Sequence, residues 1–435
     1  MRPALRLLPG LCLLVLAPAR LYAQAPAPSP SPSPTPFPSP SPSAEPSPPP
    51  RLPEAPIVSG QQPPAGGRPL ADMAPPSSQG QFVRLPPWLL TVRLRESYLE
   101  NPRFEAGSQD ENTFVDSGGV TLSRFFRGSR GQLALTGNAN GAHYHVDDTL
   151  NRFGWSAGLA GTHRFTPRTT FLLSEEVVSA YTRETALLTG GGVLLPLART
   201  LSTHGAVEVA HQASTRNTLA VNARYDTVDF EDAALAEGRE LALGARFGRQ
   251  LSATGSLDMT YVHQRSMLET RTQPAHSLHL GWTGTSGPRF AFYLAGGATY
   301  LPATDVTTEE WAPYAAVEGA FNGRHGSFSV SYSHSVSQAL GTGRVREADL
   351  VSAGASRSLA TWATVFAHYG YSRSEDIFDP TYVFDAQGWE GGLRFGLTRD
   401  LTLTAAYVQR RSTTTGAAET VSDSAHLSLA YSKGF

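Results

Sequence analysis

The sequence predicts an all-β fold: a closed, antiparallel, up-and-down transmembrane β-barrel of about 18 strands, with 16 strands as the alternative. Beyond Trp88, apolar and polar residues alternate with a period of two, in segments of about ten residues, and the spacing typical of helices does not occur. Short and long connections alternate along the whole region. After the N-terminus, no stretch approaches the roughly 18 apolar residues of a transmembrane helix.

Residues 1–23 predict a secretory signal peptide. Arg2 and Arg6 precede an apolar centre around Leu11 to Leu16, and small residues follow near Ala23. The only cysteine, Cys12, lies in the apolar centre and would be removed with it. A disulfide framework, a thiolate zinc site and a cysteine nucleophile are therefore excluded from the exported chain.

Residues 24–87 predict a disordered linker rich in Pro, Ser, Ala and Gly. The run PSPSPSPTPFPSPSPSAEPSPPP has too few apolar residues for a core and favours extended polyproline II. We expect a periplasmic spacer, and the alternative is a docking site for a periplasmic partner.

Residues 88–435 predict the barrel. SFSVSYSHSVS places Phe328, Val330, Tyr332 and Val336 on one face and serines on the other. Eight short connections predict hairpin turns, at 127, 166, 214, 248, 284, 322, 357 and 398. Nine longer polar stretches begin near Asn101, His143, Thr182, Phe230, Ser266, Pro302, Gln338, Arg373 and Ser412. These connections separate 18 strands and place both ends of the barrel on one side.

The asymmetry between short and long connections favours a membrane barrel over a soluble sandwich. Transmembrane barrels have short periplasmic turns, long outer loops and a polar interior, and their closure leaves no unpaired strand edge in the lipid. Aromatic residues near the long loops are typical of an interfacial belt: Tyr98, Phe104, Tyr144, Tyr181, Phe230, Tyr300, Tyr371 and Phe378.

The final stretch LSLAYSKGF places Leu427, Leu429, Tyr431 and Phe435 at alternating positions, with Lys433 as the departure from an apolar pattern. It resembles the C-terminal signature of Gram-negative outer-membrane β-barrels, and the ladder from Trp88 onward resembles porin-like barrels of an uncharacterised family with turns such as RQLS and RTLS. The RTLS at 199 falls in a predicted loop. The resemblance implies an outer-membrane location, contact with outer-membrane lipid, and recognition of these four residues by the barrel-assembly machinery.

Charged residues opposite the apolar faces are predicted to line a hydrated lumen, because charges facing lipid are unfavourable by about 2–4 kcal/mol at mid-membrane. They are Arg224, Asp226, Arg246, Asp258, His279, Glu390 and Arg394. At about 18 strands, a barrel is wide enough for an aqueous channel unless something fills it. A long loop, notably residues 183–199, could fold inward instead.

Charge placement predicts a weak preference for cations. Arginines occupy or adjoin every short turn, whereas acids collect in the long loops. Glu309, Glu310, Glu375 and Asp376 are the predicted mouth acids. The alternative is that such acids only keep the outer surface soluble or bind divalent ions shared with anionic lipid. The formal net charge of −2 offers no electrostatic basis for a nucleic-acid partner.

No catalytic or cofactor site is predicted. Histidines are scattered, and Ser333 and Ser335 face away from His334 in the alternating strand. His143 and His145 precede Asp147 and Asp148, which allows a casual surface cation at a wet loop mouth. The sequence therefore favours a passive channel for small hydrophilic solutes. The alternatives are the barrel component of polymer export or an envelope scaffold, and, less favoured, a lipid-modifying enzyme.

Overall fold

The computed structural model describes residues 86–101, 112–181, 198–232, 235, 237–268, 271–287, 289–304, 307–339, 344–379, 381–415 and 419–435. The barrel lies in the compact unit Glu54–Phe435, and the other unit, Met1–Pro53, lies outside the described residues. The predicted signal peptide and almost all of the predicted linker also lie outside them, so both stay predictions. In the part of the chain that is described, no helix is long and apolar enough to cross a membrane.

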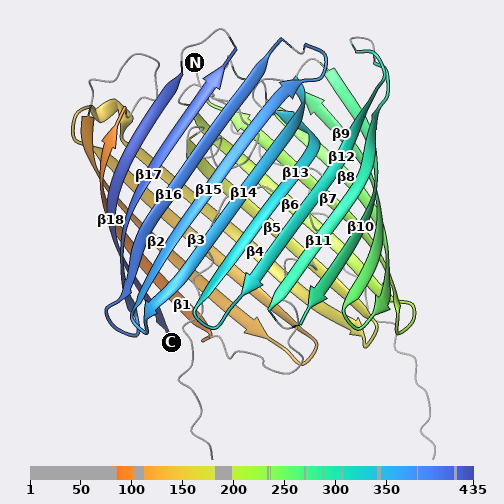
Figure 1. Ribbon diagram of the computed structural model, residues 1–435, viewed down its shortest axis with the longest axis horizontal. Coiled ribbons are helices and arrows are strands. Elements are labelled where there is room, and N and C mark those ends of the chain that lie inside the picture. The colour runs from red at the N-terminus through yellow and green to blue at the C-terminus, as the bar shows by residue number, and fades with distance from the viewer. Residues whose placement is uncertain are drawn as a thin grey trace, which may run out of the picture. The chain divides into compact units, whose positions relative to one another are not determined.

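A single sheet of 18 strands forms the fold and confirms the predicted class (Figure 1). The strands are β1 (Trp88–Glu100), β2 (Asn112–Arg127), β3 (Gly131–Tyr144), β4 (Arg152–Thr166), β5 (Thr169–Tyr181), β6 (Arg199–Gln212), β7 (Asn217–Phe230), β8 (Gly238–Ser252), β9 (Gly255–Leu268), β10 (Arg271–Ser286), β11 (Phe290–Leu301), β12 (Glu310–Asn322), β13 (Gly326–Ala339), β14 (Arg344–Ala360), β15 (Ala363–Asp376), β16 (Val383–Gly396), β17 (Leu401–Thr414) and β18 (Thr420–Gly434). A short 3-10 turn, η1 (Asp148–Leu150), follows β3.

The sheet closes on itself through its first and last strands. Each strand pairs antiparallel with its neighbours in sequence, and β1 pairs with both β2 and β18. The closing ladder runs from Leu89 opposite Gly434 to Leu99 opposite Ser424. The Trp88 N–H donates to the Phe435 carbonyl at 3.0 Å, and the Phe435 N–H donates to the Trp88 carbonyl at 3.1 Å. Closure therefore leaves no unpaired edge among the 18 strands that the structure describes.

The outer face of the barrel is apolar. Leu94 is 59% exposed and pairs with Leu429, which is 37% exposed. Large apolar side chains are exposed at alternate positions along the other strands too, including Leu241 and Leu243 on β8 and Leu278 and Leu280 on β10. Such a face suits hydrocarbon rather than water.

The inner face carries hydroxyl groups that bond between strands. The hydroxyl oxygens of Ser331 and Ser352 lie 2.7 Å apart between β13 and β14, and those of Thr91 and Ser432 lie 3.0 Å apart across the closing ladder. A closed barrel with a wet interior and an apolar exterior is the form in which β-strands span the Gram-negative outer membrane. This is the location of the protein.

Connections follow the predicted alternation. The eight predicted turns all join consecutive strands at one end of the barrel, where the C-terminus also lies, and the longer predicted loops all join strands at the other end (Figure 1). Two connections differ from the prediction, and a third difference concerns aromatic residues. The RTLS at 199 begins β6 instead of lying in a loop, and only residues 269–270 separate β9 from β10.

The third difference concerns the predicted aromatic belt. Tyr98 is exposed at the outer surface, as a belt requires, but Tyr144 is buried among Val115 and Leu150 on the inner side. Phe378 packs against a second buried cluster. The belt was predicted from closeness to the long loops, without regard to facing. Alternation along β3 from the outward Leu133 and Leu135 in fact places Tyr144 on the inner side. Phe104 lies outside the described residues.

Candidate channel lumen

The register places the predicted lining residues on the face opposite the exposed apolar side chains. Arg224 and Asp226 flank the exposed Tyr225 on β7, and Asp258 lies between the exposed Leu257 and Met259 on β9. By the same alternation, the inner face includes Arg246, His279, Glu390 and Arg394.

An ionic network joins the inner faces of β6, β7 and β8. Arg224 Nε lies 2.7 Å from Asp226 Oδ2, and its terminal nitrogen donates to Glu240 Oε1 at 2.5 Å. His204 Nδ1 lies 2.8 Å from the other oxygen of Asp226. Because a one-residue slip would move these groups to opposite faces, the network depends on the register of all three strands.

Further acids lie on the same side of the barrel. Glu208 on β6 is 1% exposed, and Asp258 on β9 and Glu318 on β12 also face inward. Next to them His279 stacks on Tyr314, with ring centroids 3.7 Å apart and an angle of 11° between the rings. The inner wall from β6 to β12 therefore carries more acidic residues than arginines, which are Arg224 and Arg246.

Basic residues dominate the wall formed by β16, β17, β18 and β1. The Arg95 guanidinium lies 3.0 Å from His426 Nδ1 and donates to Ser97 at 2.9 Å. Arg410 lies near enough to interact electrostatically with Arg95, and Glu390 is the acid between them. Lower on β16, Arg394 lies 5.4 Å from the ring centre of Phe366.

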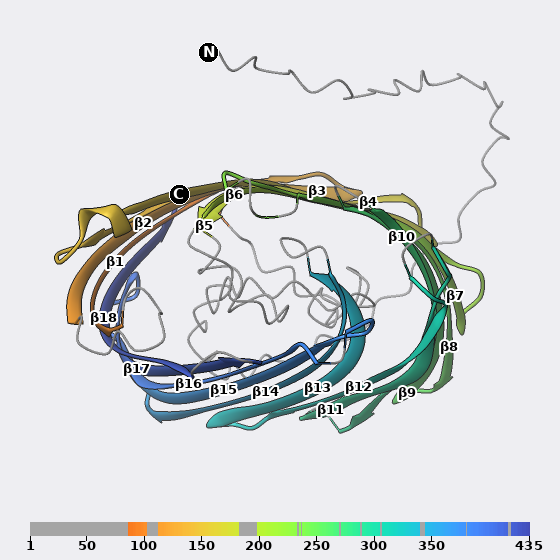
Figure 2. The same cartoon turned by 90° about the horizontal axis from the view of Figure 1, so that it is seen from above.

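The acidic and the basic parts of the wall lie toward opposite ends of the elongated section, with β12 and β16 on the same long side (Figure 2). In the view along the barrel, β7 and β8 lie at one end of the elongated section and β1 and β18 at the other (Figure 2). A solute inside would meet acids on one side and arginines on the other, so the lumen carries a transverse electric field.

The outer ends of β13 and β14 turn into the lumen. The β12–β13 ladder ends at Ala315 opposite His334, whereas β13 and β14 stay paired to Ala339 opposite Arg344. Val336 and Val345 pack against Leu301 and other inner residues in a buried cluster, with Ile377 and Phe378 at its edge. Figure 2 shows the paired strand ends bent toward the middle of the barrel. This hairpin end narrows the outer part of the lumen.

Arg346 fixes the base of the inward hairpin end. It is fully buried, donates to the Ser374 hydroxyl at 3.3 Å, and lies 5.0 Å from the ring centre of Tyr382. The predicted inward loop, residues 183–199, is almost wholly outside the described residues.

The predicted mouth acids have different surroundings. Glu309 accepts a hydrogen bond from the Tyr300 hydroxyl at 3.1 Å. Glu310 is exposed at the start of β12, and Glu375 pairs with Glu347 on the outward face of β14 and β15. Asp376 is buried and accepts from the Phe378 and Asp379 N–H groups at 2.9 and 3.3 Å. Asp376 thus stabilises a turn.

The predicted cation ligands near His143 are likewise engaged within the protein. His145 Nε2 lies 2.9 Å from Asp116, and Asp147 accepts the Thr149 N–H at 2.9 Å. No group of three or more His, Cys, Asp and Glu residues among those described could hold a metal ion.

The residues of the predicted assembly signal lie on the outer face. Leu427, Leu429, Tyr431 and Phe435 are all exposed there. The neighbouring strand β17 places Leu401 opposite Tyr431 and Leu403 opposite Leu429. Recognition of these residues by the assembly machinery stays a prediction.

Sequence reasoning did not identify His204, Glu240, Arg95 and Arg410. All four obey the alternation that identified the other lining residues, so their inward orientation could have been predicted. Their contacts with one another and with other lining residues could not, because each lies on a different strand and the contacts depend on the register between strands.

No family profile matches the chain, and no curated protein matches it. Among solved structures it resembles OccAB4 of Acinetobacter baumannii, with 10% identity, a TM-score of 0.46, and coverage of 81% of this chain and 99% of that chain. It also resembles the outer membrane protein opdK of Pseudomonas aeruginosa (12% identity, TM-score 0.43, 80% and 98% coverage). The siderophore receptor PirA of Pseudomonas aeruginosa follows (7% identity, TM-score 0.42, 79% and 80% coverage). Similarity of this degree concerns the overall fold only.

Proposed function

We propose that the protein is a passive channel through which small hydrophilic solutes diffuse across the outer membrane, with a weak preference for cations. The observation that carries this proposal is the contrast between the two faces of the sheet. The outer face is apolar, whereas the inner face carries paired hydroxyl groups and the ionic network of Arg224, Asp226 and Glu240. A barrel of 18 strands with such a lining leaves room for an aqueous path.

Diffusion requires no chemical step, so the inner side chains act by hydration and charge. The acid-rich wall attracts cations, and the arginines of the opposite wall attract anionic groups. A small solute that carries both charges can align with the transverse field. The inward end of β13 and β14 limits its size.

Conductance tests this function. Purified protein inserted into a planar bilayer is expected to give discrete single-channel steps, and proteoliposomes are expected to swell in small sugars. Gly370 lies on the inner face of β15 with open space around it, so Gly370→Trp is expected to lower the conductance.

Gly296→Trp is the matched control. Gly296 also has open space around it but lies on the outer face of β11, in line with the exposed Leu294. It is expected to leave the conductance unchanged. Absence of steps above the lipid background, or equal effects of the two tryptophans, would contradict a lumenal path.

A further inference from the structure

Lys433 interrupts the apolar pattern of the closing strand, and its side chain is exposed on the outer face of the barrel. It lies opposite Leu90 in the ladder between β18 and β1, on the same face as the exposed Leu429 and Tyr431. The C-terminus and the short turns share one end of the barrel, which is the periplasmic end in transmembrane barrels (Figure 1). Lys433 therefore lies at the level of the headgroups of the inner leaflet.

Arg124 is a second cation on the same outer face. On β2 it lies opposite Trp88, between the exposed Leu122 and Phe126. Its Cζ atom lies 4.7 Å from the ring centre of Trp88 and 4.5 Å from that of Phe126. These contacts hold the guanidinium beside β1, the strand that separates Arg124 from Lys433.

The two cations converge on Trp88. Lys433 pairs with Leu90, and Trp88 is the next outward residue of β1 toward the short-turn end. Lys433 and Trp88 are therefore diagonal neighbours, about 7–8 Å apart and within reach of a long side chain. A phosphate beside the Trp88 ring is thus within reach of both the ammonium and the guanidinium.

The pair of cations has apolar neighbours on the outer face. In the described residues of β1, β2 and β18, the outward acidic side chains all lie further toward the long-loop end. They are Glu96, Glu100, Asp116 and Asp423. The adjacent β16–β17 turn carries one residue of each sign, Arg399 and Asp400. The terminal carboxylate of Phe435 lies at the same end and accepts the Trp88 N–H at 3.0 Å, which leaves the two cations with a net positive charge.

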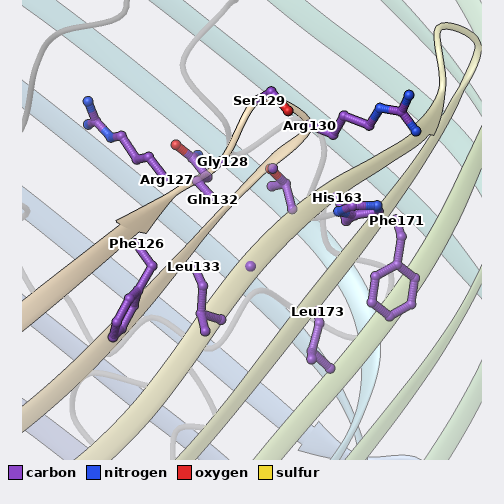
Figure 3. Close-up of a pocket in the computed structure, with 13 residues that line it drawn as sticks. Phe126, Arg127, Gly128, Ser129, Arg130, Gln132, Leu133, His163, Phe171 and Leu173 are labelled. Atoms are coloured by element: carbon purple, nitrogen blue, oxygen red, sulfur yellow. The ribbon is translucent and has the colours of Figure 1, made fainter. Parts of the chain in front are cut away.

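A neighbouring hollow on the outer surface, beside the β2–β3 turn, lacks such a pair. It has a volume of about 610 Å³, and outward apolar side chains such as Phe126 and Leu133 line it. Figure 3 shows the side chains of Arg127 and Arg130 at its edge extending in opposite directions. Arg127 follows the outward Phe126 in β2 and so faces the lumen. The hollow provides apolar surface without paired cations.

We propose that Arg124 and Lys433, on either side of Trp88, bind the phosphate of one anionic glycerophospholipid of the inner leaflet. The indole ring lies where headgroups meet acyl chains, as interfacial tryptophans do, and the outward Leu90 and Leu122 contact the first part of an acyl chain. Because apolar surface adjoins the two charges, the site suits a lipid better than a free anion. The bound headgroup bridges β2, β1 and β18, the strands at which the barrel closes.

Native mass spectrometry of the full protein, refolded in detergent, tests the site with phosphatidylglycerol as the probe. Each cation near a membrane surface contributes about fivefold to affinity for anionic lipid, so Arg124→Gln with Lys433→Gln is expected to weaken binding about 25-fold. Lys433→Arg keeps the charge and is expected to retain the lipid. Phosphatidylcholine with identical acyl chains has no net charge and is expected to bind the unaltered protein more weakly.

Arg249→Gln with Arg357→Gln is the matched control. Both arginines are exposed on the outer face at the short-turn end, but β8 and β14 are not neighbours, so the two form no pair. This variant loses equal charge and is expected to retain the lipid. Equal losses in the two double variants, or equal binding of the two lipids, would overturn the proposal.

Folding is controlled separately. Refolding in vitro avoids any effect of Lys433 on assembly in the cell, and compact gel mobility identifies the folded variants. Arg124→Gln alone lies outside the closing strand and is expected to weaken phosphatidylglycerol binding about fivefold. Unchanged binding by this folded single variant would also overturn the proposal.

Discussion

At the residue scale, Arg224 links two acids that are almost fully buried. Its guanidinium lies 2.7 Å from Asp226 and 2.5 Å from Glu240, on two strands. Arg224→Met would leave these carboxylates without their shared counter-charge. Since the arginine is partly open to the lumen, we expect a loss of about 1–3 kcal/mol in the free energy of unfolding, less than for a fully buried pair. The temperature at which the purified barrel loses its compact gel mobility should fall accordingly.

The triple variant Arg224→Met, Asp226→Asn, Glu240→Gln provides the control for this prediction. It removes both acids together with the arginine, so most of the lost stability is expected to return. If the single variant lost its compact gel mobility at the same temperature as the unaltered protein, the network would contribute nothing to stability.

At the element scale, alternation and turn chemistry were enough to predict the strands. Each strand of a membrane barrel must present apolar residues to lipid at every second position. The alternation can therefore be recognised in the sequence without similarity to a known family. The same logic predicted the facing of Arg246 and Asp258. Groups such as Arg95 with His426 were not predictable, because β1 and β18 lie at opposite ends of the barrel sequence.

The inward bend of β13 and β14 also escaped prediction. Val336 continues the outward pattern of Val330 and Tyr332, yet it is buried against Leu301. The bend depends on β13 leaving β12 after His334, a property of packing among five strands. The alternation of residues within one strand therefore cannot predict the inward bend.

Leu301→Ala tests whether this bent end narrows the channel. Leu301 has 0% exposure in the cluster that includes Val336 and Val345, and such a truncation costs about 2–5 kcal/mol. We expect the hairpin end to detach, with higher and noisier single-channel conductance. Leu294→Ala, on the outer face of the same strand, should leave conductance unchanged. A Leu301→Ala channel identical to the unaltered one would show that the bend does not limit flow.

The closing strand carries a prediction about assembly. Phe435 is 58% exposed, and its contribution to closure is through backbone hydrogen bonds with Trp88, so loss of its ring should cost little stability. Phe435→Ala is nevertheless expected to lower the amount of barrel in the outer membrane, if the ring is an assembly signal. Fractionation measures that amount, and Phe435→Tyr should preserve it. The fraction that inserts should keep normal conductance. Full insertion of the alanine variant would remove the assembly role.

At the scale of the whole molecule, charge is sorted in two directions. Along the barrel axis, arginines gather at the short turns and acids near the long loops. Around the lumen, acids collect on the inner faces of β6 to β12, and arginines on those of β1, β16 and β17. If ions diffuse through the lumen, as proposed, the first arrangement would act on ions that approach the barrel and the second on ions inside it.

Reversal potentials in a salt gradient distinguish the two arrangements. We expect a modest cation preference that fades near 1 M salt, where the Debye length falls to about 3 Å. Asp258→Asn with Glu318→Gln should lower this preference more than neutralising Glu309, Glu310, Glu375 and Asp376 together, because Glu309 bonds to Tyr300 and Asp376 stabilises a turn. Glu96→Gln, on the outward face of β1, is the matched control and should change nothing. An anion-preferring pore would contradict both arrangements, whereas a larger effect of the four loop acids would place the selectivity at the mouth.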